Sequence, residues 1–160
     1  MKCMKEVLRL LICMIGGLIG MVSCSTQKMP EGSLVRVEYT RSGTMAGYQY
    51  EGRVTQDSNG VFVLRAMKEM YGPLFEKTLD AEAMQRFHQI IEEEKMYKYK
   101  EVYRPLMKVL DGKRWSFKME FSDGTIISSH GENASPSGEG LKRINELMQE
   151  LVQDSQKKSN

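Results

Sequence analysis

The sequence predicts an α+β domain in which an antiparallel sheet of about five to six strands carries two helices on one face. Alternating apolar and polar residues, separated by turn residues, predict strands in both halves of the chain. Two other segments repeat apolar residues with the period of an amphipathic helix. Short turns rich in Asp, Asn and Gly favour antiparallel neighbours. We therefore expect the order βββ-α-β(β)β-α in a single domain over residues 33–153.

The first half of the domain predicts a three-stranded antiparallel meander. Val35, Val37 and Tyr39 alternate with polar residues, as expected of a strand with one buried face. A turn at residues 57–60 ends in Asn-Gly, which tolerates the positive φ angles of a hairpin. The three predicted strands span residues 34–40, 48–55 and 61–64.

The first helix begins after Asp80, a good N-cap, and Leu79 can pack against Met84 across the first turn. Its apolar stripe contains Ala83, Met84, Phe87, Ile90 and Ile91. A second helix is expected to begin near Ser135-Pro136 or somewhat later, because Gly138 and Gly140 weaken that opening. Its predicted stripe contains Leu141, Ile144, Leu147, Met148 and Leu151.

Between the helices, two Asp-Gly turns separate three predicted strands at residues 106–110, 115–121 and 125–129. The middle strand points four large apolar side chains to one side: Trp115, Phe117, Met119 and Phe121. Such a face must be covered, and the two helices are the available cover.

The N-terminus has the layout of an export signal, with basic residues before an apolar run over residues 10–22. The run ends in Met21-Val22-Ser23-Cys24, which resembles the lipobox of bacterial lipoprotein precursors, although Met21 stands where Leu is more usual. The resemblance implies that residues 1–23 are a signal peptide, cleaved before Cys24, and that Cys24 carries acyl chains such as palmitate. Residues 24–32 would then be a flexible tether, and the polar residues 154–160 a disordered tail.

Removal of the signal changes the charge and the cysteine count. The chain has 23 basic and 21 acidic residues, and the signal contains three of the former and one of the latter, which leaves 20 of each. A neutral domain does not suggest a nucleic-acid partner. Cys3 and Cys13 leave with the signal, so only Cys24 remains. We therefore expect no disulfide, metal site or cofactor.

Ser128, His130 and Glu132 are the only cluster of nucleophile, base and acid types, and a hydrolase would need them within hydrogen-bond reach. Adjacent strand residues point to opposite faces and alternate residues lie about 6.6–6.8 Å apart, so the interpretation of a strand end is favoured. His88 and Glu92 share a helix face, a spacing that more often stabilises a helix than binds metal.

A tyrosine- and lysine-rich segment at residues 95–104 allows two interpretations. Tyr97, Tyr99 and Tyr103 would line one face of a strand, where they could contact a glycan or a peptide. The simpler interpretation is that the tyrosines cover the sheet while the lysines remain in solvent.

Residues 110–136 resemble a stretch of small uncharacterised lipoproteins of gut-type Bacteroidetes. The shared frame is Asp-Gly-x-x-Trp followed by a strand, a second Asp-Gly turn and Ser-x-Gly-x-Asn-x-x-Pro, matched here by Ser129, Gly131, Asn133 and Pro136. No activity is established for that group, so the resemblance implies fold and location and no catalytic residue.

The sequence thus predicts a non-enzymatic, lipid-anchored lipoprotein of the bacterial cell envelope that binds an envelope protein or a glycan. The expected location is the outer membrane. In lipoproteins of the resembled group, acidic residues just after the cysteine favour surface display, so their absence from residues 25–28 implies that the domain faces the periplasm. Two alternatives remain open. One is an inhibitor-like module that blocks a hydrolase with the loop at residues 131–140. The other is a hydrolase that uses the Ser128, His130 and Glu132 region.

Overall fold

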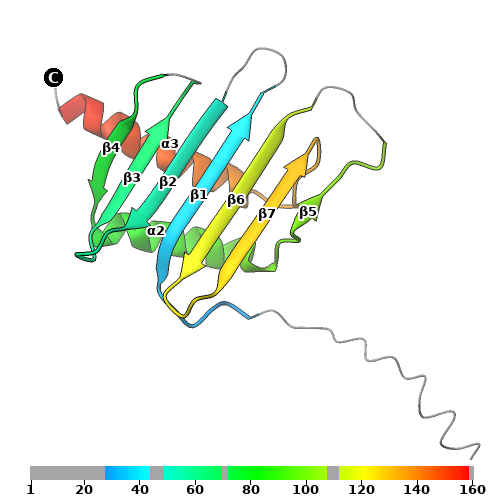
Figure 1. The fold of residues 1–160 in the computed structure, drawn as a ribbon, viewed down its shortest axis with the longest axis horizontal. Coiled ribbons are helices and arrows are strands. Elements are labelled where there is room, and N and C mark those ends of the chain that lie inside the picture. Colours follow the sequence, from blue (N-terminus) through cyan, green and yellow to red (C-terminus); the bar gives the residue numbers. More distant parts are fainter. Residues whose placement is uncertain (1–27, 44–48, 70–71, 108–111, 159–160) are drawn as a thin grey trace, which may run out of the picture.

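A computed structural model describes residues 28–43, 49–69, 72–107 and 112–158. These residues form one seven-stranded mixed sheet with two α-helices on one face (Figure 1). The predicted signal peptide and Cys24 lie outside the described residues. The strand order is β4-β3-β2-β1-β6-β7-β5. The elements are β1 (Leu34–Ser42), β2 (Gln49–Gln56), β3 (Phe62–Met67), β4 (Phe75–Leu79), α2 (Ala81–Glu93), the 3₁₀ helix η2 (Met96–Lys98), β5 (Val102–Tyr103), β6 (Arg114–Phe121), β7 (Ile126–Glu132) and α3 (Gly140–Lys158).

The predicted α+β class is confirmed, whereas the strand count and the purely antiparallel pairing need correction. β4 was not predicted, because only Phe75 and Leu79 of its five residues are large and apolar. β5 pairs in parallel with β7 through Val102 and Tyr103, and two residues are too few to produce an alternating pattern. No strand occupies residues 106–107 of the predicted segment 106–110; Leu106 and Met107 are exposed, and residues 108–110 lie outside the described part.

The core lies between the sheet and the two helices, which run behind the sheet in Figure 1. Val37, Val54, Leu64, Phe117 and Met119 point from the central strands into this layer and are almost fully buried. Phe87 and Ile91 of α2 and Ile144 and Met148 of α3 meet them from the other side. Burial of such side chains stabilises the fold by about 1.5–3 kcal/mol each.

Helix α2 follows the prediction. Asp80 is its N-cap, and the Asp80 carboxylate accepts a hydrogen bond of 2.8 Å from the backbone N–H of Ala83. The buried residues of α2 are the predicted stripe of Ala83, Met84, Phe87, Ile90 and Ile91. Local capping and apolar period therefore determined this element.

Helix α3 begins at Gly140, five residues after Ser135. Gly138 adopts a φ of +101°, which is incompatible with a right-handed helix, so the preceding residues form a loop. The backbone N–H of Glu139 donates to the Glu94 carboxylate at 3.1 Å, which fixes the loop to the end of α2. The helix continues to Lys158, beyond Asp154, where the sequence indicated the start of a disordered tail.

Ion pairs join the two helices. Arg86 donates to both carboxylate oxygens of Glu150 at 2.7 and 2.8 Å, and Arg143 contacts Glu93 and Glu94 at 2.8 and 2.9 Å. Hydrogen bonds from Arg86 and Arg143 lower the pKa of Glu150 and Glu94 respectively. The pairs orient α3 against α2; Arg143–Glu94 is half-buried, whereas the more exposed pairs add little stability by themselves.

The segment before β1 is attached to the β6–β7 turn. Gly32 donates its backbone N–H to the Asp123 carboxylate at 3.1 Å, and Ser33 donates to the Ser122 hydroxyl at 2.9 Å. In return, the backbone N–H of Ser122 donates to the carbonyl of Ser33. Met29 packs against the core, so residues 29–33 contact the domain although 24–32 were predicted to be a flexible tether. No helix in the described residues is both long and apolar enough to cross a membrane.

Candidate functional site

At one end of the sheet, β1 and β7 end and β6 begins (Figure 1). Trp115 is the second residue of β6 and lies at this end. Its indole Nε1–H donates a 2.7 Å hydrogen bond to the carbonyl of Ala134, which holds the loop after β7. Gly131 is the cross-strand partner of Trp115. A Cβ at Gly131 would lie 2.6 Å from the indole nitrogen, so only glycine lets the ring lie across β7.

Asn133 fixes the same loop to β6. Its φ of +51° is one that Asn adopts more readily than most residues. Its backbone N–H donates to the carbonyl of Lys113 at 2.9 Å, and its side-chain oxygen accepts from the N–H of Lys113 at 3.0 Å. Gly112 leaves room for the Asn133 side chain, which a Cβ there would strike.

These contacts give physical roles to several residues of the segment 110–136. Gly112, Trp115, Gly131 and Asn133 are the residues that lock the loop to the sheet. Ser129 is fully buried, and its hydroxyl donates to the carbonyl of Lys100 at 2.6 Å, which fixes the segment leading into β5. Together these residues hold the loop after β7 and the segment before β5 in place, and they form a wall at this end of the sheet.

That wall separates two cavities. The first, of about 590 Å³, lies between the ends of β1 and β6, the loop after β7 and the first turns of α3. Its described lining residues include Tyr39, Arg41, Ser135, Pro136 and Asn145. This volume is within the range of small-molecule sites.

The second cavity, of about 770 Å³, lies between β5 and the ends of β6 and β7. Tyr103, Arg104, His130 and Glu132 line it. Both cavities are bordered by Arg114, Trp115 and Asn133. We refer to the two cavities together, with this shared wall, as the Trp115 site.

Cations predominate in the Trp115 site. Its described lining contains five basic side chains and one carboxylate: Arg41, Arg104, Lys113, Arg114 and Lys142, with Glu132. Arg114 contacts Glu132 at 3.2 Å, and Lys142 contacts Glu139 at 2.8 Å. Within the described residues, Arg41, Arg104 and Lys113 form no ion pair.

Aromatic rings in tilted and edge-to-face contact lie next to the site. Tyr103 lies 5.7 Å from Trp115 and 6.3 Å from Tyr99, between ring centroids, and Tyr99 lies 6.4 Å from Phe117. Burial raises the pKa of Tyr99 to about 12, with a smaller contribution from Glu94. Burial also raises the pKa of Tyr39, which Arg41 partly opposes. The rings thus remain neutral and packed at physiological pH.

The predicted row of three tyrosines does not form. Tyr97 belongs to η2, where Lys98 Nζ lies 5.7 Å from its ring centroid, while Tyr99 and Tyr103 turn towards the sheet. Lys98 and Lys100 are exposed, as in the simpler of the two interpretations. Residues 95–104 include a 3₁₀ turn, so strand parity does not apply.

Ser128, His130 and Glu132 lie in a row on the sheet face opposite the helices. No hydrogen bond joins their side chains within the described part of the chain. His130 and Glu132 border the second cavity, whereas Ser128 is not among its described lining residues. His88 is half-buried on α2, and no group of three potential metal ligands occurs among the described residues.

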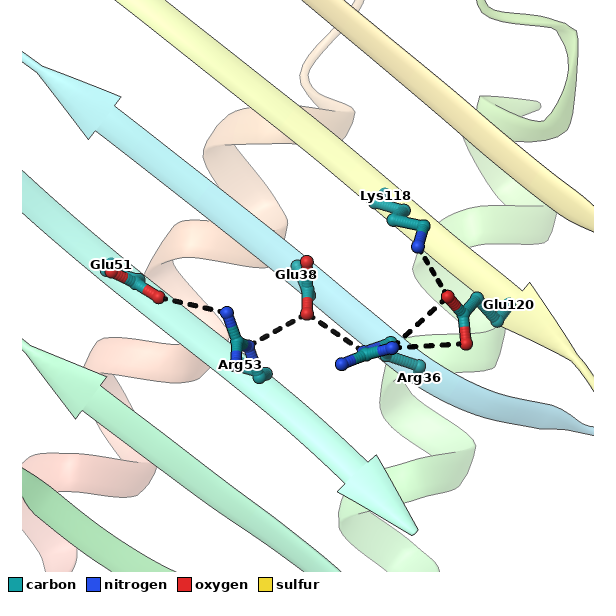
Figure 2. A network of polar contacts seen from close by, with 6 residues as sticks. All are labelled: Arg36, Glu38, Glu51, Arg53, Lys118 and Glu120. Atoms are coloured by element: carbon teal, nitrogen blue, oxygen red, sulfur yellow. Dashed lines mark hydrogen bonds and ion pairs between the residues drawn. The ribbon is translucent and has the colours of Figure 1, made fainter.

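The open sheet face carries a second polar constellation, a chain of alternating charges that crosses β2, β1 and β6 (Figure 2). Glu38 is the carboxylate common to two ion pairs, because Nε of Arg36 and Nε of Arg53 each lie 2.8 Å from the same carboxylate oxygen. These are charge contacts without hydrogen-bond alignment. The chain comprises Glu51, Arg53, Glu38, Arg36, Glu120 and Lys118 and has no net charge.

Sequence reasoning did not predict the Trp115 site. Arg41 lies more than sixty residues before Arg104 and Lys113 in the sequence, and no local pattern connects the three. The available signal was the frame of residues 110–136, whose glycines and asparagine indicate a fixed loop.

Comparison with known proteins identifies neither a family nor a curated relative of this chain. A scan against protein-family models finds no match for the chain, and no curated protein matches its sequence.

Proposed function

We propose that this protein is a lipid-anchored binding module of the bacterial cell envelope, held in the outer membrane by acyl chains on Cys24 and facing the periplasm. Its partner is an envelope protein or a glycan, which the Trp115 site binds without chemical change. The anchor rests on the N-terminal sequence, and the binding role rests on the geometry of the site.

One observation carries the binding role: two cavities of ligand size share a wall that several independent contacts hold in place. Trp115 and Asn133 hold the loop after β7 to β6, and Ser129 holds the segment before β5. A site held in its binding geometry loses little conformational entropy when a ligand binds. The unpaired cations and aromatic rings of the lining supply polar and apolar contacts for such a ligand.

Binding without catalysis fits the side chains of the lining. His130 is the one histidine there, and no lining hydroxyl of the described residues donates a hydrogen bond to it. A nucleophile and a positioned base are the minimum set for covalent hydrolysis.

A pair of variants in one loop tests the binding role. Ser135 and Ser137 are both exposed, but only Ser135 is among the described lining residues of the first cavity. Ser135→Trp should fill the cavity and abolish partner capture in affinity purification from solubilised membranes or on a glycan array. Ser137→Trp adds the same ring to the same loop and should retain capture. Equal behaviour of the two variants would refute a role for this cavity.

The anchor has its own test. Cys24→Ser should prevent acylation and release the protein from the membrane fraction while thermal unfolding of the domain remains unchanged. A Cys24→Ser protein that still fractionates as a processed membrane form would show that the anchor assignment is wrong.

A further inference from the structure

We infer that the ligand of the Trp115 site is an anionic oligosaccharide, with carboxylate or sulfate groups bound by the cations and sugar rings packed against the aromatic wall. This inference rests on the proposed binding function and specifies its ligand class.

Charge segregation is the first argument. The chain after Cys24 has equal numbers of basic and acidic residues, yet the described lining of the site has an excess of four cations. Elsewhere on the sheet, cations lie beside carboxylates, as Arg36 and Arg53 do with Glu38. Cations around a cavity that have no carboxylate partner are available to an anionic ligand.

The chemistry of the cations and rings is the second argument. Guanidinium groups such as that of Arg41 present parallel N–H donors that match the oxygens of a carboxylate or sulfate. Trp115 and Pro136 provide apolar surface beside these donors. A sugar ring has apolar C–H faces and hydroxyl edges, so it can use both kinds of surface at once. Asn133 and Asn145 border the first cavity with amide groups that suit hydroxyls.

The division of the site indicates an oligosaccharide of at least two sugar residues. The two cavities meet at Arg114, Trp115 and Asn133, and each has its own unpaired cations. Arg41 and Lys113 serve the first cavity, and Arg104 serves the second. A chain with charges on successive residues can therefore place one anionic group in each cavity.

Trp115 is the only tryptophan of the chain, so its fluorescence reports directly on this site. Full-length protein in detergent micelles is titrated with tetragalacturonate, with its methyl ester and with a sulfated oligosaccharide of equal length. We expect saturable changes with an anionic probe, weakening with added salt. The methyl ester should bind at least about tenfold more weakly, because it lacks the charges that form assisted hydrogen bonds.

Matched variants locate the effect. Arg41→Gln combined with Lys113→Gln should weaken binding of the anionic probe at least about tenfold. Arg65→Gln removes a cation from the open sheet face, where Arg65 pairs with Glu76 at 2.7 Å, and should change affinity less than about twofold. Unchanged far-ultraviolet circular dichroism in all variants would exclude unfolding as the cause.

Three outcomes would overturn the inference. Equal affinity for the acid and its methyl ester would show a neutral-sugar site and leave the binding function intact. Tighter binding of an oligothymidylate than of any saccharide would assign the cations to nucleic acid. No fluorescence change with any saccharide, together with capture of an envelope protein that Ser135→Trp abolishes, would make the ligand a protein; without such capture the binding function would fail as well.

Discussion

The open sheet face and the Trp115 site use the same types of side chain in opposite ways. On the open face, three cations and three carboxylates alternate across β2, β1 and β6, and each cation contacts a carboxylate (Figure 2). At the Trp115 site, cations outnumber carboxylates and three of them have no ion-pair partner among the described residues. Paired charges keep a sheet face hydrated and neutral, whereas unpaired charges around a cavity remain available to a ligand.

The largest effect that separates the two regions is expected from Gly131→Ala. The added methyl group would collide with the Trp115 indole and the carbonyl of Ala134. We expect a loss of about 1–3 kcal/mol in the free energy of unfolding, measured with urea, because a packed region must shift. Ligand capture should fail.

Gly124→Ala is the control for that variant. Gly124 has a φ of +84° in the β6–β7 turn, and nothing lies within 4 Å of the position that the new methyl group would take. Backbone strain should cost about 1–2 kcal/mol, with ligand capture preserved. If Gly124→Ala also abolished capture, stability and not local geometry would explain the first result.

Trp115→Phe should have the next largest effect. It keeps an aromatic ring on β6 but removes the N–H that donates to the carbonyl of Ala134. Loss of one such bond costs about 0.5–1.5 kcal/mol of unfolding free energy. We also expect faster amide hydrogen exchange in residues 133–138, because the loop loses its tie to the sheet. Unchanged exchange there would show that Asn133 alone holds the loop.

Glu38→Gln tests the open face and should have a smaller effect. It keeps the size of the side chain but removes the negative charge of Glu38 that both Arg36 and Arg53 contact. The expected loss is about 1 kcal/mol or less by urea unfolding, since the group is close to solvent. Binding at the Trp115 site should not change. Reduced affinity of the Trp115 site for its ligand would mean that the charges of the two regions interact electrostatically.

The smallest effect is the acid sensitivity that Glu120 contributes. The hydrogen bond from Lys118, together with Arg36, lowers the pKa of Glu120. The resulting stability is therefore present above the ordinary glutamate pKa of about 4.5 and is lost as the pH falls through the lowered value. Glu120→Gln should lower neutral stability by a small amount, because the ionised carboxylate is gone, and should flatten the stability profile below that pH. An equally steep acid loss in Glu120→Gln would assign the effect to other carboxylates, such as Glu150.

Local signals determined how much of this structure was predictable. Helix α2 was correctly predicted because its cap and its stripe lie within fourteen consecutive residues, from Asp80 to Glu93. The buried and exposed faces of β6 were predicted correctly because Phe117, Met119 and Phe121 alternate with polar residues. The expectation that helices cover these residues is confirmed as well.

Long-range pairing was not predictable from the sequence. β5 exists because Val102 and Tyr103 align with His130 and Gly131, residues almost thirty positions away, and nothing within residues 102–103 announces that contact. The Trp115 site was not predicted for the same reason, because Arg41 lies beside Trp115 only through the pairing of β1 with β6. The predicted lipid anchor at Cys24 and its signal stay predictions, because they lie outside the described residues.

The attachment of Gly32 and Ser33 to the β6–β7 turn sets the direction in which the domain would be presented. This turn follows Phe121, and the six residue steps from there to Trp115 span about 20 Å along β6. With acyl chains on Cys24, the turn would form the membrane-proximal end of the domain and Trp115 the distal end. The cavities would then lie at the end of the domain that is farther from the anchor.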